Sequence, residues 1–315
     1  MIFKPVSTVI ATALVLGCGP KNSAETGIDA GASSSPPTVL RDLTYTPPPG
    51  VDAGMATLDL FRPAGDHTSP LVLLVHGGSW VGGDKSNFES TLVPWWNAQG
   101  YAAAPVNFRL STRPGESPQV KPRDQARDVA AALGWMMASA DEYKIETEDI
   151  VLVGYSSGAH LVALLGTDER ILQEAGLDET QVAAAISLDV HAYDVPYALE
   201  LMEGSVVEDN IPSIQHLFGS TTEEQLEGSP IHYVDGWAAS ALVVSTDEDP
   251  EVEGTYGFVV AEAASHYADA LAAADHSVTT LHDRTETHSS LVMGFGEPED
   301  LTTAAIEALL ASLRR

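Results

Sequence analysis

The chain has 315 residues, enough for one large domain or two small ones, and 44% of them are hydrophobic, which is ample for a substantial core. Its 15 Lys and Arg residues stand against 45 Asp and Glu residues, giving a formal charge of −30. Such a charge disfavours binding to nucleic acid or acidic lipid, and it favours a neutral or cationic ligand over an anionic one. The single cysteine excludes an intramolecular disulfide.

The start of the chain has the pattern of a bacterial lipoprotein. Residues 1–17 form a signal peptide pattern, whose apolar stretch from Val6 to Leu16 is too short to span a bilayer permanently. Val15-Leu16-Gly17-Cys18 resembles a lipobox, so we expect Cys18 to be lipidated; a plain secretory signal with an incidental cysteine is the alternative. Residues 18–38 are rich in Gly, Ser, Ala and Pro and predict a flexible tether. The protein is therefore expected in the bacterial cell envelope, lipid-anchored at the outer membrane, or secreted.

Residues 39–315 predict one domain in which strands alternate with helices. Strands are expected over 39–46, 55–61, 71–75, 101–108, 150–154, 181–190, 241–245 and 277–282, and helices over 88–99, 122–138, 159–165, 253–274 and 298–313. The irregular, polar segment 191–236 is expected to be a cap or insertion. This alternation predicts an α/β fold with a doubly wound, mostly parallel sheet covered on both faces.

A candidate nucleophile lies where the fifth predicted strand meets the following helix. Gly154-Tyr155-Ser156-Ser157-Gly158 has the pattern of a nucleophile elbow, in which a sharp turn exposes the serine above a helix N-terminus. Gly154 and Gly158 would let the backbone bend tightly and let neighbouring elements approach. A Gly-rich turn with an idle serine is the alternative, so partner residues decide the matter.

A base and an acid follow later strands in the order that the elbow requires. Active groups gather beyond the carboxyl ends of parallel strands. Asp247 and Asp249 follow the seventh predicted strand, and His288 follows the eighth. The order Ser156, Asp249, His288 is typical of a Ser-Asp-His triad on this kind of sheet, with Asp247 as the rival acid.

Other polar residues have weaker patterns. His191 and Asp194 follow the sixth predicted strand and could contact a substrate, but two isolated groups do not make a metal site. His160 is expected to pack within its helix, and His276 and His282 to be structural or solvated. No metal or organic cofactor is expected.

Further motifs extend the pattern along most of the domain. They are His76-Gly77-Gly78-Ser79-Trp80, Gly83-Asp84, Asn107-Phe108-Arg109-Leu110, Pro122, Asp128, Trp135, Ser229-Pro230-Ile231 and Asp249-Pro250-Glu251-Val252. With these motifs the chain resembles the α/β-hydrolase superfamily, specifically the bacterial esterases related to hormone-sensitive lipase, feruloyl esterases and arylformamidases. The resemblance covers about residues 56–313 and implies an α/β-hydrolase fold with a cap.

The resemblance also implies an oxyanion hole. Backbone N–H groups of Gly78 and Ser79, joined by that of Ser157, would bind the oxyanion, while His76 and Gly77 support the loop. The lipase branch usually has glycine where this chain has Ser79, and this favours the feruloyl esterase and arylformamidase branch.

The acid loop and two aromatic residues leave alternatives open. Ser245-Thr246 replaces the usual His-Gly of the acid loop, so Asp249 is less firmly placed than Ser156 or His288. Tyr155 and Trp80 are expected either to line the acyl or alcohol pocket or simply to pack.

The function predicted from the sequence is a serine carboxylesterase acting on a small-molecule ester through an acyl-enzyme. The alternatives are an amide-cleaving arylformamidase or peptidase with the same triad, and a non-catalytic envelope lipoprotein. Nucleic acid is not expected as a partner, and a membrane is expected only through the N-terminal anchor. Neither the acyl and alcohol specificity nor the oligomeric state is predicted.

Overall fold

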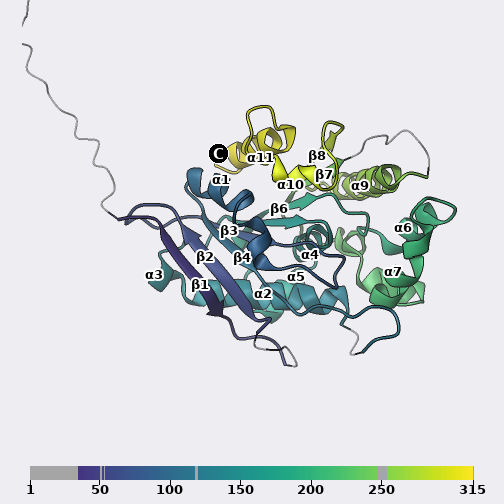
Figure 1. The fold of residues 1–315 in the computed structure, drawn as a ribbon, viewed down its shortest axis with the longest axis horizontal. Coiled ribbons are helices and arrows are strands. Elements are labelled where there is room, and N and C mark those ends of the chain that lie inside the picture. The colour runs from purple at the N-terminus through teal and green to yellow at the C-terminus, as the bar shows by residue number, and fades with distance from the viewer. Residues whose placement is uncertain (1–34, 50–51, 53, 118–119, 247–253, 315) are drawn as a thin grey trace, which may run out of the picture. The chain divides into compact units, whose positions relative to one another are not determined.

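One twisted sheet organises the domain (Figure 1). The computed structural model describes residues 35–49, 52, 54–117, 120–246 and 254–314. In the described residues eight strands pair in the order β1-β2-β4-β3-β5-β6-β7-β8. Their bounds are β1 (Thr38–Thr44), β2 (Thr57–Arg62), β3 (Leu71–Val75), β4 (Ala102–Val106), β5 (Ile150–Tyr155), β6 (Val182–Leu188), β7 (Ser240–Thr246) and β8 (Val278–Asp283). β2 runs antiparallel to β1 and β4, and the pairs from β4 to β8 are parallel, so this is the predicted α/β-hydrolase sheet.

Helices cover both faces of the sheet. Because side chains alternate along a strand, β3 sends Leu71, Leu73 and Val75 into one core and Val72 and Leu74 into the other. The first core is closed by α2 (Pro122–Ala138), α4 (Ser157–Leu165), α5 (Glu169–Glu174) and α9 (Tyr256–Ala273), and the second by α1 (Leu92–Ala98), α10 (Ser290–Met293) and α11 (Leu301–Leu313). Burial of both faces of the sheet explains why these strands are continuous apolar runs in the sequence.

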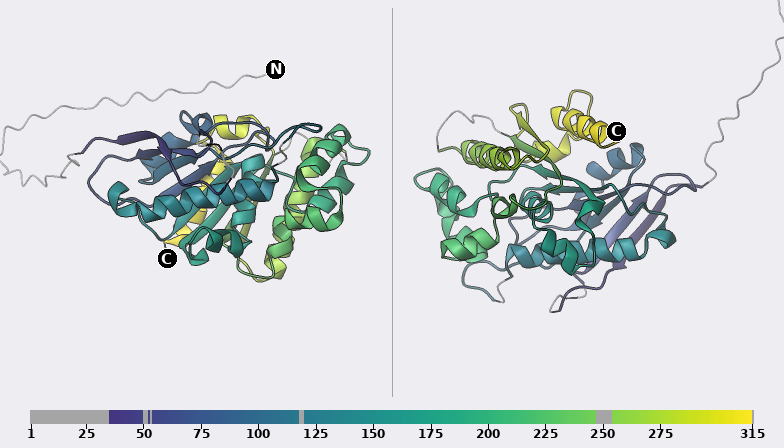
Figure 2. Two further views of the ribbon diagram at one scale, coloured as in Figure 1. Left: turned by 90° about the horizontal axis from the view of Figure 1, so that it is seen from below. Right: turned by 180° about the vertical axis from the view of Figure 1, so that it is seen from behind.

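The predicted cap is helical. Between β6 and β7 the chain forms α6 (Val195–Met202), η3 (Glu208–Asn210), α7 (Ile211–Phe218), α8 (Thr222–Glu227) and η4 (Pro230–Tyr233). Helices α6 and α7 lie together beside α9 at one side of the sheet (Figures 1 and 2). The fully buried Ser229 joins the two ends of the cap, because its hydroxyl accepts from the N–H of Val195 in α6 at 2.9 Å.

Most predicted elements are present, several with shifted ends. The strand 71–75 and the helix 122–138 have the predicted bounds, whereas the helix predicted over 88–99 is split into η1 (Lys85–Phe88) and α1. The short helices α3 (Ala140–Tyr143), α5 and α10 and the 3₁₀ turn η2 (Glu179–Gln181) were not predicted.

The predicted N-terminal features remain predictions. The signal peptide, Cys18 and most of the tether lie outside the described residues, and β1 begins at Thr38, next to the expected start of the domain. Within the ranges that the structure describes, no helix has the length and apolar character needed to cross a bilayer.

We expect Gly158→Ala to destabilise the fold. A Cβ at Gly158 would lie 2.1 Å from the carbonyl oxygen of Val75, so α4 would have to move away from β3. The overlap should outweigh the better helix propensity of alanine and lower the free energy of unfolding by about 2 kcal/mol or more, measured by urea denaturation. Gly236→Ala is the control, because the nearest atom to its added Cβ is 3.5 Å away. Equal stability of the two variants would contradict this account of the packing.

Candidate active site

The turn between β5 and α4 exposes Ser156. Its backbone has φ 55° and ψ −126°, outside the regions that L residues favour, which costs about 1–3 kcal/mol. The turn is held from a neighbouring strand, because the Ser156 N–H donates to the Leu188 carbonyl at 2.8 Å. A Cβ at Gly154 would lie 2.1 Å from the carbonyl oxygen of Gly158, so this turn requires glycine. The hydroxyl therefore stands above the N-terminus of α4, where negative charge is favoured.

His288 reaches Ser156 from the loop after β8. Its Nε2 lies 3.1 Å from the Ser156 Oγ, so the structure brings together the predicted nucleophile and base. The Tyr155 ring stacks on the imidazole with 4.9 Å between centroids, and the Tyr155 hydroxyl donates to the His288 carbonyl at 2.6 Å. Burial, with the nearby Asp189 charge, raises the pKa of Tyr155 to about 12, so this hydroxyl keeps its proton at neutral pH.

A buried carboxylate completes the chain of hydrogen bonds. Asp189 directly follows β6, is fully buried, and places Oδ2 2.5 Å from Nδ1 of His288. Its other oxygen, Oδ1, accepts from the Thr246 N–H at 2.6 Å. Because a carboxylate only accepts, Nδ1 carries the proton and Nε2 is left as the acceptor for the Ser156 hydroxyl.

The sequence predicted the acid on another segment, the loop after β7. Asp249 and its rival Asp247 lie outside the described residues, so their positions stay untested. In the structure, the hydrogen-bond partner of His288 Nδ1 is Asp189. From the sequence, Asp189 was expected to lie inside the strand predicted over 181–190. The observed strand ends at Leu188, which puts Asp189 at the carboxyl edge of the sheet. A lone acid at the end of an otherwise apolar strand, next to the elbow strand, was the signal that could have found it.

The loop after β3 supplies the candidate oxyanion donors. Three consecutive residues have positive φ, namely Gly78 (139°), Ser79 (53°) and Trp80 (63°). His76 is fully buried, stacks on Phe108 with 4.5 Å between centroids, and its Nδ1 donates to the Gly77 carbonyl at 3.0 Å. These contacts fix His76 inside the base of the loop.

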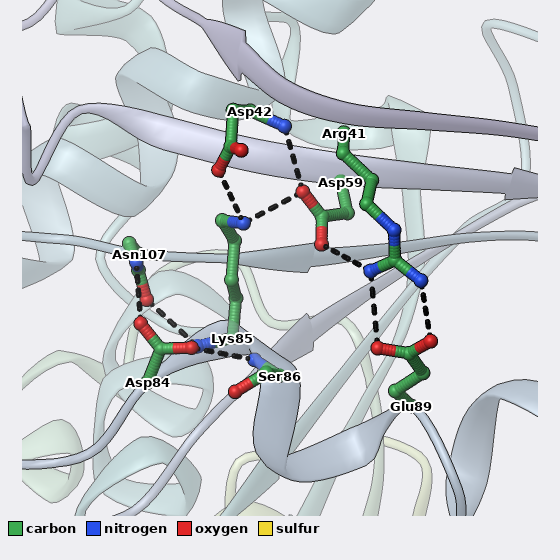
Figure 3. A network of polar contacts seen from close by, with 8 residues as sticks. All are labelled: Arg41, Asp42, Asp59, Asp84, Lys85, Ser86, Glu89 and Asn107. Carbon is green, nitrogen blue, oxygen red and sulfur yellow. Dashed lines mark hydrogen bonds and ion pairs between the residues drawn. The ribbon is translucent and has the colours of Figure 1, made fainter.

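A polar network anchors the far end of this loop (Figure 3). The largely buried Lys85 ammonium donates to Asp59 at 2.6 Å and to Asp42 at 2.9 Å. The backbone N–H of Lys85 donates to the side-chain oxygen of Asn107 at 2.7 Å. Burial alone would raise the pKa of Asp84, but hydrogen bonds from Ser86 and Asn107 lower it to about 2. Asp84 thus joins this loop to Asn107, which follows β4, and Lys85 joins it to β1 and β2 through paired charges.

Two hollows meet at Ser156. The first, of about 460 Å³, lies on the cap side, and the second, of about 450 Å³, lies toward α10. Ser79, Ser156 and His288 line both. The first is also lined by Trp80, Arg113, His191, Ile214, Leu217 and Tyr256, and the second by Gly78, Asn87, Phe88, Tyr155, Val292 and Met293. Trp80 and Tyr155 therefore both line a hollow and pack.

Comparison with known proteins identifies the family. Residues 58–261 match the family model described as BD-FAE, which is more than half of the chain. The chain belongs to the BD-FAE family.

Relatives of this BD-FAE chain include proteins named as esterases. Two come from Mycobacterium tuberculosis: "Probable carboxylic ester hydrolase LipM" is 28% identical over 61% of this chain and 44% of its own length. "Esterase LipQ" is 25% identical over 62% of this chain and 46% of its own length. The chain thus spans less than half the length of these curated relatives.

Solved structures share the fold. Esterase B from Lactobacillus rhamnosis superposes with a TM-score of 0.67 at 18% identity, covering 90% of this chain and 89% of that chain. A thermophilic esterase from the Planctomycetes species Thermogutta terrifontis, bound to butyrate, gives a TM-score of 0.64 at 20% identity, covering 86% and 93%.

The other polar residues singled out from the sequence of the BD-FAE chain make local contacts or line a hollow. Asp194 caps α6 by accepting from the Tyr197 N–H, while His276 Nε2 donates to the Val234 carbonyl at 2.7 Å. His282 Nδ1 is 2.8 Å from the Ser245 hydroxyl. His191 lines the first hollow, and burial lowers its pKa to about 4. Among the described residues no group of three or more His, Cys, Asp and Glu is placed to hold a metal ion.

We expect the fold of the BD-FAE chain to lose stability between pH 6.5 and pH 4 through His160. This residue is fully buried, and burial lowers its pKa from 6.5 to about 4. Below pH 6.5 the unfolded chain therefore binds a proton that the folded chain excludes, so the stability present at pH 7 decreases as the pH falls. The loss should be about 2 kcal/mol between pH 7 and pH 5.

Urea denaturation of the wild type and of His160→Gln at both pH values isolates this contribution, because the carboxylates titrate in both proteins and their effect cancels. The difference in free energy of unfolding between the wild type and the variant should be about 2 kcal/mol smaller at pH 5 than at pH 7, because only the wild type loses the contribution of His160. A pH-independent difference would show that the fold does not exclude the proton at His160.

Proposed function

We propose that this BD-FAE protein is a serine esterase that hydrolyses carboxylic esters with the triad Ser156, His288 and Asp189. The observation that carries the proposal is the continuous chain of hydrogen bonds from Ser156 Oγ to His288 Nε2 (3.1 Å) and from His288 Nδ1 to Asp189 Oδ2 (2.5 Å). A serine hydroxyl is a weak nucleophile until a base accepts its proton and a third group orients that base, and this arrangement supplies both.

The first half of the reaction forms an acyl-enzyme. As Ser156 Oγ bonds to the ester carbonyl carbon, its proton moves to Nε2 of His288, and the carbonyl oxygen becomes an oxyanion. The imidazolium is stabilised by Asp189, whose charge is already present and buried. The bond from carbon to the alcohol oxygen then breaks, and the alcohol leaves with the proton from Nε2.

The second half releases the acid. A water molecule gives a proton to Nε2 of His288 while its oxygen attacks the acyl carbon. The second tetrahedral intermediate collapses by breaking the bond to Ser156 Oγ, which takes the proton back. The enzyme returns to its starting protonation state.

Backbone N–H groups of Gly78, Ser79 and Ser157 are proposed to bind the oxyanion. Ser157 is the first residue of α4, and the first N–H groups of a helix have no acceptor within it. Gly78 and Ser79 line the hollow that Ser156 shares, on a loop whose strained backbone is held by buried contacts. Each such donor is worth about 2.7–4 kcal/mol of barrier in enzymes of this kind.

The relatives support ester chemistry over the amide alternative. Both curated proteins described above have names that refer to ester hydrolysis. The same triad can also cleave amides, so a direct comparison of ester and amide substrates distinguishes the two activities.

Ser156→Ala should remove covalent reactivity and turnover together. Because the alanine has no oxygen to form the acyl-enzyme, kcat on p-nitrophenyl butyrate should fall by at least about 10⁴-fold. A fluorophosphonate probe should label the wild type and not the variant. Faster turnover of formylkynurenine or aminoacyl anilides than of esters would favour the amide alternative. A wild type that neither reacts with the probe nor cleaves any of these substrates would support a binding role.

Asp189→Asn should lower kcat by about 10³- to 10⁴-fold with little change in KM. The amide can donate to Nδ1, which would leave the imidazole in the tautomer that cannot accept the serine proton. Asp249→Asn and Asp247→Asn are the matched controls, and we expect kcat within about threefold of wild type for both. Loss of kcat in Asp249→Asn with an active Asp189→Asn would move the acid to the loop after β7.

A further inference from the structure

Trp80 is the last of the three residues with positive φ in the loop after β3, and it makes three hydrogen bonds. Its carbonyl accepts from the Gln125 side chain at 2.7 Å and from the Ser111 N–H at 2.9 Å. Its indole Nε1–H donates to Nδ1 of His160 at 3.3 Å, and the whole residue is buried. Because Trp80 directly follows Ser79, holding Trp80 restrains the Ser79–Trp80 peptide and through it the backbone of Ser79, whose N–H lies on the preceding peptide.

His160 can serve as this acceptor in only one tautomer. Its Nε2 lies 2.7 Å from the Gly228 carbonyl, which accepts hydrogen bonds and cannot donate them. Nε2 therefore carries the proton, and Nδ1 presents a lone pair to the indole of Trp80. Burial lowers the pKa of His160 to about 4, so the ring is neutral at physiological pH and the lone pair is present.

The outer partners of this arrangement belong to the cap. Gly228 follows α8, and Phe218, the last residue of α7, packs edge-on against both Trp80 (5.3 Å between centroids) and His160 (5.2 Å). A Cβ at Gly228 would lie 2.7 Å from the Phe218 ring, so the two cap residues are in close contact. The cap thus contacts the oxyanion loop through a buried imidazole on the elbow helix α4.

We propose that His160 is a positioning residue, which couples the cap to the oxyanion hole by holding Trp80 and through it the Ser79 N–H. The proposal rests on the esterase function proposed above. It predicts that loss of the Trp80 contact weakens binding of the transition state while binding of the substrate is unaffected, because the oxyanion exists only in the transition state.

Two substitutions of His160 separate its two hydrogen bonds. In His160→Asn the side-chain oxygen takes the place of Nδ1 and retains an acceptor for Trp80. In His160→Gln the side-chain nitrogen takes the place of Nε2 and retains the donor to Gly228, but the acceptor for Trp80 is lost. Both variants are neutral. A structural role through the Gly228 hydrogen bond would favour His160→Gln, whereas the positioning role through Trp80 favours His160→Asn.

The kinetics of these variants test the proposal. We expect His160→Gln and Trp80→Phe each to lower kcat by about 30-fold with KM within twofold, and the double variant to be no worse than either, because both remove one interaction. His160→Asn should keep at least about ten times the kcat of His160→Gln. The affinity for a boronic acid, which mimics the tetrahedral intermediate, should fall in proportion to kcat. His276→Ala, which removes a different imidazole-to-carbonyl hydrogen bond, should lower stability and leave kcat unchanged.

The outcomes that overturn the proposal are distinct from failure of the proposed function. Equal kcat for the Asn and Gln variants, additive losses in the double variant, or a change confined to KM would each contradict the positioning role in an active enzyme. Circular dichroism of each variant shows whether it is folded before its kcat is compared. A wild type without ester turnover would contradict the proposed function itself.

Discussion

The buried charge of Asp189 is the constraint on which the site depends. A carboxylate without exposure to water is stable only if its oxygens are paired, and here the partners are the His288 Nδ1–H and the Thr246 N–H. These partners come from the loop after β8 and from the end of β7, so the requirement for pairing draws three separate segments to one edge of the sheet. The imidazole is oriented toward Ser156 as a consequence of satisfying this charge.

The sequence predicted the sheet, the elbow serine and the histidine beside it, but not the carboxylate that lies against that histidine in the structure. Strand 71–75 and helix 122–138 were predictable because their apolar spacing reflects burial on two faces or on one. Ser156 and His288 were predictable because each lies beside a strand end with few competitors. Asp189 was not, since an acid followed by another apolar residue, Val190, looks like part of the strand until the strand end is known.

The cap was the least predictable part for a physical reason. Its helices have six to eight residues, too few for a periodic pattern to stand out from chance, and they are stabilised by contacts with α4 and α9. His160 illustrates the same limit. Its pattern predicted a packing residue, and the structure agrees that it is buried, but its two hydrogen bonds depend on Trp80 and Gly228, which are distant along the chain.

The two hollows on either side of Ser156 have a consequence for how selectivity can change. In the proposed esterase, Ser156 would meet the two parts of the ester with different walls. One wall is built largely from the cap, and the other from the loop after β3 and from α10 with the loop before it. Substitutions in Ile214 or Leu217 can then alter preference for one fragment without disturbing recognition of the other. For the proposed esterase, this separation would let the two halves of the ester be selected by independent sets of side chains.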